Sequence, residues 1–172
     1  MNNKYKRIIA AAGICVLLLI SVFFGYHGFV GVSANNPEKL TAAAEDYFET
    51  DGLKLLQTEK RGNYLAVLFR DKNKKAVVGV FERDSVFQSR YEVSGGTTDI
   101  ESGKIVSWNC GNEKGEAVLA FGGIGIPDNV NSYAFTNSGI GYTCPVDSEN
   151  VLNLFVIPDE QDINAAPEPI TE

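Results

Sequence analysis

The chain has 172 residues, close to the size of one domain, and its hydrophobic content of 44% is sufficient for a core. This composition excludes a wholly disordered chain. The net charge of −7 makes nucleic-acid binding unfavourable, because an acidic surface repels phosphate backbones.

The N-terminal segment predicts that the chain is exported. Lys4, Lys6 and Arg7 precede residues 8–32, which contain no charged side chain. This stretch exceeds the roughly 20 residues that a membrane helix requires, and basic residues stay on the cytoplasmic side. We therefore expect a cytoplasmic segment at 1–7, a transmembrane helix at 8–32, and a single-pass protein of the cell membrane with its C-terminal domain outside.

The same segment also fits a signal sequence, which is the alternative prediction. Val32, Ser33 and Ala34 place small or acceptable residues at the positions that a signal peptidase reads. Cleavage after Ala34 would give a secreted protein. Both alternatives place the folded domain, expected over residues 36–158, outside the cytoplasm.

The exported domain is expected to begin with an amphipathic helix. Asn36 is suited to cap it, Pro37 to occupy its first position, and Gly52 to end it. Apolar side chains recur with helical spacing at Leu40, Ala43, Ala44, Tyr47 and Phe48. One face of this helix should therefore pack on a sheet.

After Gly52 the apolar period changes to two, which predicts strands. Nine such runs follow one another: LKLLQTEK, NYLAVLFRD, AVVGVFER, VFQSRYEV, KIVSWN, EAVLAFG, SYAFTN, GIGYTC and VLNLFVIP. The second and third runs are apolar on both faces and should lie at the sheet centre. The predicted fold class is α+β, with one helix packed on a mainly antiparallel sheet of about seven to nine short strands. A two-layer β-sandwich is the alternative.

The last segment, residues 159–172, is acidic and rich in Pro and Ala. It has little apolar surface to bury, so it is expected to be a disordered tail.

The residue inventory limits the chemistry. His27 is the only histidine, so the exported domain contains none for a Ser-His-Asp or Cys-His arrangement or for a His-ligated zinc site. We expect no metal and no cofactor. Carboxylate chemistry would require two converging acidic groups, for which Asp99, Glu101 and Asp128 are the candidates because they lie in predicted loops.

Two other segments resemble ligand motifs only in part. The run GGIG at 122–125 lacks the context of a dinucleotide fingerprint and is typical of a turn or bulge. Asp71 and Asn73 resemble the start of a calcium loop, but later ligands are missing and a hairpin turn explains them better.

Cys110 and Cys144 each end a predicted strand, after VSWN and IGYT respectively. The period of two places both cysteines on a core-facing side, and export permits a disulfide between them. A simple up-and-down meander would, however, put them at opposite ends of their strands. The alternative is that both are buried thiols.

These observations favour a membrane-anchored extracytoplasmic binding or accessory domain that is not an enzyme. Its expected partner is an unknown envelope or extracellular protein or peptide, with the membrane contacted by the N-terminal helix and no role for nucleic acid. Two alternatives remain: an exported carboxylate-dependent hydrolase, and a sensor domain that works with a membrane partner.

Overall fold

The computed structural model describes residues 3–111, 115–137, 140–157 and 166–171, without the side chains of 3–11, 26–30, 111 and 137. Two helices, α1 (Asn3–Val30) and α2 (Pro37–Phe48), and eleven strands form within these residues. The strands are β1 (Val32–Ser33), β2 (Lys54–Arg61), β3 (Tyr64–Arg70), β4 (Ala76–Arg83), β5 (Arg90–Ile100), β6 (Val106–Gly111), β7 (Ala117–Gly123), β8 (Val130–Asn137), β9 (Ile140–Pro145), β10 (Val151–Ile157) and β11 (Glu168–Thr171).

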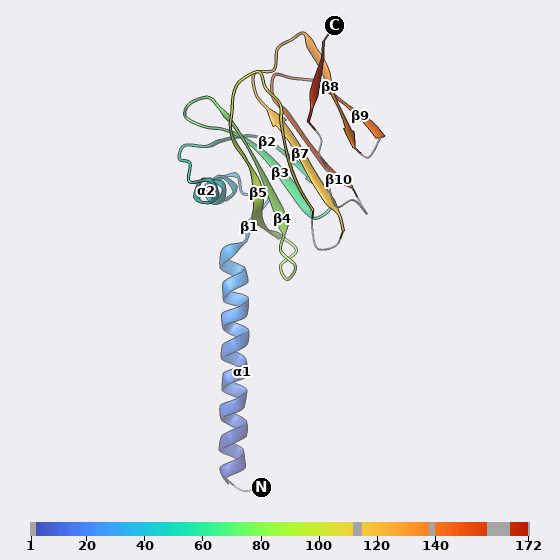
Figure 1. Ribbon diagram of the computed structural model, residues 1–172. Helices are drawn as coiled ribbons and strands as arrows, with labels where there is room; N and C mark the ends of the chain where they lie inside the picture. Colours follow the sequence, from blue (N-terminus) through green and yellow to red (C-terminus); the bar gives the residue numbers. More distant parts are fainter. Residues whose placement is uncertain (1–2, 112–114, 138–139, 158–165, 172) are drawn as a thin grey trace.

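The strands form three sheets that lie in successive layers (Figure 1). Sheet A has the order β1-β5-β4-β3-β2, sheet B has the order β10-β7-β6, and sheet C has the order β11-β8-β9. Every pairing described between strands is antiparallel, which confirms the antiparallel arrangement predicted from the sequence.

Strands β3 and β4 occupy the centre of sheet A, as their apolar sequences predict. Residues 64–69 and 76–81 are buried without exception, so both faces of each strand are covered. One face packs on α2 and the other on sheet B. The continuous apolar runs of these strands are explained by this double burial.

Three apolar clusters hold the layers together. The first lies between α2 and sheet A and includes Leu40, Ala44 and Phe69. The second lies between sheets A and B, and the third, which is rich in aromatic rings, lies between sheets B and C. Each sheet therefore contributes to the core by burying side chains against a neighbouring layer.

Helix α2 begins where the sequence predicts and ends slightly earlier. The Asn36 side chain accepts a hydrogen bond of 3.0 Å from the Lys39 N–H, and Pro37 is the first helical residue. Glu49 adopts the left-handed conformation at the C-cap, with φ of 51°. The amide of the predicted terminator, Gly52, instead donates to the Glu45 carboxylate at 2.7 Å.

The predicted α+β fold class is wrong. The molecule is mostly β, and its strands form three stacked sheets in place of one helix-covered sheet. The two-layer sandwich also omits sheet C. Sequence periodicity identifies strands but does not show which strands hydrogen-bond to one another, because that depends on contacts distant in the chain.

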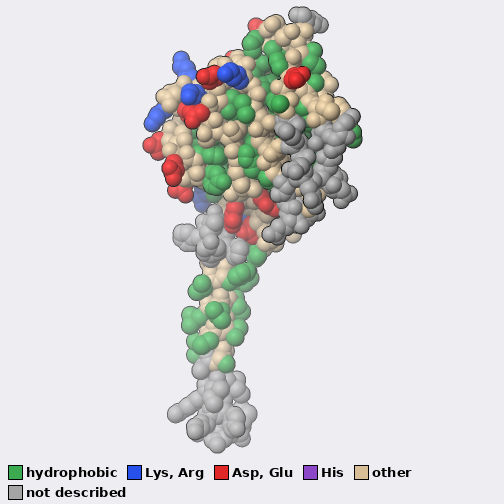
Figure 2. All heavy atoms as spheres, viewed as in Figure 1, with side chains coloured by type: hydrophobic (Ala, Val, Ile, Leu, Met, Phe, Trp, Pro, Cys, Tyr) green, Lys and Arg blue, Asp and Glu red, His purple; other side chains and the backbone are tan. Residues whose placement is uncertain are grey.

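The predicted transmembrane helix at 8–32 is also corrected. Helix α1 forms and extends away from the sheets, and Figure 2 shows hydrophobic side chains around its described part. Among the described residues, however, no helix has both the length and the apolar character that crossing a membrane demands.

Two segments that the sequence places outside the fold form strands. Val32 and Ser33, from the candidate cleavage site, form β1 and pair with Tyr91 and Arg90 of β5. Residues 168–171, from the predicted disordered tail, form β11 and pair with β8. The remainder of that tail, at 159–165 and at 172, lies outside the described residues.

Candidate functional site

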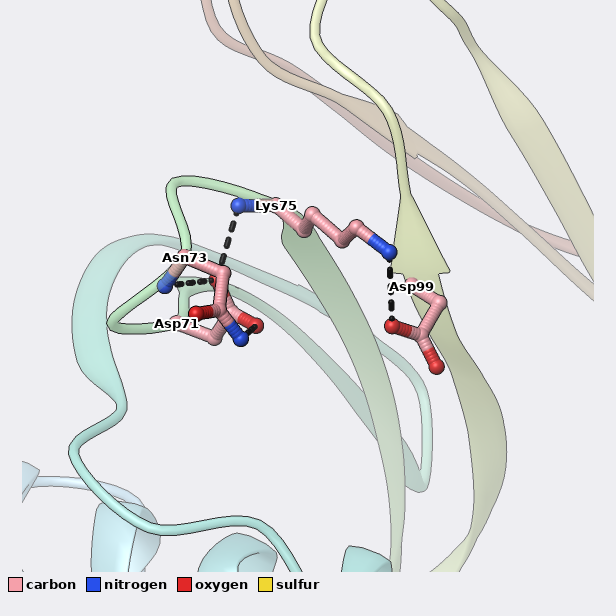
Figure 3. Close-up of polar contacts among 4 residues, drawn as sticks. All are labelled: Asp71, Asn73, Lys75 and Asp99. Atoms are coloured by element: carbon pink, nitrogen blue, oxygen red, sulfur yellow. Dashed lines mark hydrogen bonds and ion pairs between the residues drawn. The ribbon is translucent and has the colours of Figure 1, made fainter.

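The three candidate catalytic carboxylates do not share a site. Asp99 lies in β5 and accepts a hydrogen bond of 3.1 Å from the Lys75 ammonium group (Figure 3). Glu101 follows β5 and pairs with Lys104 at 2.6 Å, which lowers the pKa of the Glu101 carboxyl group. Asp128 is exposed in the turn before β8. Two of these carboxylates are thus paired with lysines, and the cleft described below contains none of the three.

Asp71 belongs to a hairpin turn, as the sequence favours. One of its carboxylate oxygens accepts hydrogen bonds from the Asn73 N–H at 2.8 Å and from the Lys75 N–H at 2.7 Å (Figure 3). Lys74 adopts a positive φ of 63° in this turn. The carboxylate therefore satisfies backbone donors between β3 and β4. No group of three or more metal-ligating side chains occurs in the part of the chain that the structure describes.

Cys110 and Cys144, the pair considered for a disulfide, are both free thiols in the structure. Cys110 lies on β6 and packs on the cluster between sheets A and B. Cys144 lies on β9 in the cluster between sheets B and C. The two strands belong to different sheets, which explains why similar local patterns do not bring the sulfur atoms together. Burial raises the pKa of both thiols.

The most enclosed hollow among those described lies beside β8 and has a volume of about 230 Å³. We call it the β8 cleft. Its lining residues come from the segment that enters β6, from the turn before β8, from β8 itself and from the end of the chain: Gly103, Lys104, Ile105, Val106, Ile126, Val130, Tyr133, Pro167 and Pro169. Lys104 is the charged member of this set, and the remaining walls are largely apolar.

Glycines allow one wall of the β8 cleft to come close to the end of β7. A Cβ atom on Gly123 would collide with the carbonyl oxygen of Lys104. Gly103 has φ of +84°, and its N–H donates to the Ile124 carbonyl oxygen at 2.8 Å. The turn at 101–104 is thereby fixed against the GGIG run, which makes this glycine-rich segment a structural support of the cleft.

The opposite wall of the β8 cleft comes from the end of the chain. Pro169 of β11 lies directly opposite Tyr133 of β8, and Glu168 lies opposite Ala134. Alternate residues of a strand share a face, so Pro167 and Pro169 lie on the same side of this segment. Both prolines line the cleft.

Tyr133 connects the β8 cleft to the interior of sheets B and C. Its side chain is fully buried, and its hydroxyl group has no hydrogen-bond partner among the described residues. Burial raises the pKa of Tyr133, and the neighbouring Cys144 thiol raises it further. This phenol stays protonated at neutral pH and can serve as a wall of the cleft, not as a base.

A second, more polar hollow of about 300 Å³ lies at one end of β4 and β5. Glu82 and Glu92, which line it, face each other across these strands. Asp84 also lines it, but its carboxylate accepts hydrogen bonds from the Val86 and Phe87 amides, each at 2.6 Å. The sequence reasoning missed the Glu82 and Glu92 pair because neither residue stands in a recognisable motif.

The β8 cleft was also missed at the sequence level. The GGIG run and the two alternating prolines are its visible signals, since each marks an unusual backbone requirement. Their proximity depends on β11 pairing with β8, which no local pattern reveals. Comparisons with protein-family models, with curated proteins and with solved structures gave no match to this chain.

Proposed function

We propose that this chain is a non-enzymatic binding domain that acts outside the cytoplasm and holds a protein or peptide in the β8 cleft. One observation carries the proposal: a largely apolar hollow of about 230 Å³ in which an extended segment of the chain itself forms one wall. Concave apolar sites with few polar groups are the usual binding sites of proteins.

The positions of the carboxylates favour binding over hydrolysis. Carboxylate-dependent hydrolysis needs two acidic groups on either side of the reacting bond. Asp99 and Glu101 are instead paired with Lys75 and Lys104 on the surface. Among the described residues that line the β8 cleft there is no acidic side chain, so these residues favour apolar binding over carboxylate catalysis.

The proposed location rests on the charge order at the N-terminus, where three basic residues precede residues 8–32. Protease added to intact host cells should digest the domain, while a cytoplasmic marker protein stays intact. Survival of the domain until the cells are lysed would contradict a location outside the cytoplasm.

Site-specific photo-crosslinking in host cells tests the binding site without assuming the ligand. The full chain would carry p-benzoylphenylalanine in place of Lys104, which lines the cleft, or in place of Lys75, which does not. Both lysines are solvent-accessible and both form an ion pair, so they are matched positions. We expect a discrete adduct from position 104 alone. The same adducts from both positions, or none from either, would remove support for a binding site in the β8 cleft.

A further inference from the structure

Building on the proposed function, we propose that the ligand of the β8 cleft is an extended peptide with prolines at alternate positions. It is added to β8 as an antiparallel strand. Strand β11, which forms one wall of the cleft, occupies this edge of β8, and a partner peptide takes its place by displacing it.

The strand register defines which side chains of a bound strand contact the cleft. Pro169 lies opposite Tyr133 and faces the cleft together with Pro167, two positions earlier. Glu168 and Ile170 have the opposite phase and do not line the cleft, although all residues of β11, Pro169 included, are exposed. The site therefore contacts every second side chain, which is the form that recognition by strand addition takes.

Proline suits these positions for two physical reasons. It has no N–H group, so it is tolerated in a strand at the edge of a sheet where one side of the backbone is unpaired. Its fixed φ also keeps the free peptide extended, which lowers the conformational entropy lost on binding. The site suits proline in both respects. β11 is the outermost strand of sheet C, so one side of its backbone is unpaired, and the walls beside it are largely apolar.

Strand β11 is held in a way that permits its release. All four of its residues are exposed, including Ile170 with 45% of its surface accessible. Its pairing with β8 shifts register between Ile170 and Thr171. Release of β11 therefore exposes little apolar surface that was buried before. Strand β8 remains paired with β9 on its other side.

The test uses the ¹⁵N-labelled full chain titrated with the peptide AAPEPITE, which repeats residues 165–172. The peptide AAPPEITE has the same composition with adjacent prolines and is the matched control. In a variant with Pro167→Asp and Pro169→Asp, which disfavours β11, we expect saturable amide shifts in Val130–Asn137 and at 103–106. The same peptide should bind the native chain at least about tenfold more weakly, because its own β11 competes at high effective concentration.

Two isoleucine variants, made in the Pro167→Asp, Pro169→Asp background, provide a second control. Ile126 and Ile124 are both 5% exposed, but Ile126 lines the cleft and Ile124 packs between sheets A and B. We expect Ile126→Ala to abolish the peptide shifts and Ile124→Ala to retain them. Equal binding of the two peptides, or shifts away from β8, would overturn the proposal even if one variant failed to fold.

The outcome is distinct from that of the crosslinking experiment. An adduct from position 104 without binding of AAPEPITE would refute the ligand class and leave the proposed binding site intact. A dimer of the native chain whose formation blocks the peptide would show that the occupant is a second copy, which would also overturn this inference. Absence of both adduct and peptide binding would refute the two proposals together.

Discussion

The carbonyl oxygen of Lys104 occupies the space that a Cβ atom on Gly123 would need. This contact fixes the turn at 101–104 against β7 and so shapes the β8 cleft. We expect Gly123→Ala to lower the free energy of unfolding by about 1–3 kcal/mol, because the backbone must shift to relieve the overlap. Chemical denaturation measures the change.

Gly141→Ala is the matched control for this substitution. Gly141 also lies in a strand, but a Cβ atom there would have no neighbour within 4 Å. Its replacement should change stability by no more than about 0.5 kcal/mol. Similar losses of unfolding free energy in the two variants would mean that replacing any glycine in a strand causes the effect, and that the contact with Lys104 does not.

Burial of Glu59 gives the second prediction. Burial raises the pKa of this carboxyl group above its ordinary value of 4.5, although the Arg61 charge and the Leu154 amide act in the opposite direction. The carboxyl group of Glu59 therefore loses its proton at a lower pH in the unfolded chain than in the folded protein. The contribution of Glu59 to stability is therefore complete below pH 4.5 and declines as the pH rises through the raised value.

We expect Glu59→Gln to be more stable than the native chain at neutral pH and to match it in acid. Thermal denaturation at a series of pH values provides the measurement. The glutamine side chain can still accept the hydrogen bond from the Leu154 amide, so packing is preserved. A stability difference that grew toward acid pH would contradict the assigned sign.

Local signals in the sequence were sufficient for the individual elements. Asn36 and Pro37 define the start of α2 through short-range hydrogen bonding and a fixed φ, and both act there in the structure. The run at 76–83 is β4 itself, because six buried residues in succession require a covered strand. Such signals depend only on residues close together in the sequence, so they can be interpreted without knowledge of the fold.

The assembly of those elements depended on contacts that local patterns do not contain. The end of the chain has little to bury, yet Glu168 and its neighbours are ordered by backbone pairing with β8. Apolar periodicity does not detect a strand held in this way. The acidic loop residues were assigned from loop position alone, whereas Asp99 lies opposite Lys75 only because β4 and β5 pair.

The cysteines give the third prediction. Cys110 and Cys144 belong to different sheets and are free in the structure. We expect mass spectrometry of the unreduced protein, alkylated after unfolding, to show both thiols modified. Addition of a reducing agent should leave the melting temperature unchanged. In the native state Cys144 should react slowly, because it is 4% exposed and burial raises the pKa of its thiol.

A mass two units lower, with both residues protected from alkylation, would reveal a disulfide and contradict this arrangement. Thiol labelling at Cys15 provides an internal control, since that residue is exposed.

The fourth prediction concerns where the mature chain begins. Cleavage after Ala34 would detach β1, in which Val32 and Ser33 pair with β5 and Val32 packs against the α2 cluster. It would also remove the Gly31 carbonyl oxygen that accepts a hydrogen bond of 2.6 Å from Arg90. A protein that starts at Asn35 should therefore be less stable than one that retains residues 31–34 by about 2–3 kcal/mol, since each lost hydrogen bond is worth about 1 kcal/mol.

The substitution Arg90→Ala provides the control. It should lower the free energy of unfolding of the longer protein by part of that difference, and it should leave the shorter protein unchanged. Equal stability of the two proteins would show that β1 contributes nothing and that cleavage after Ala34 leaves the fold intact.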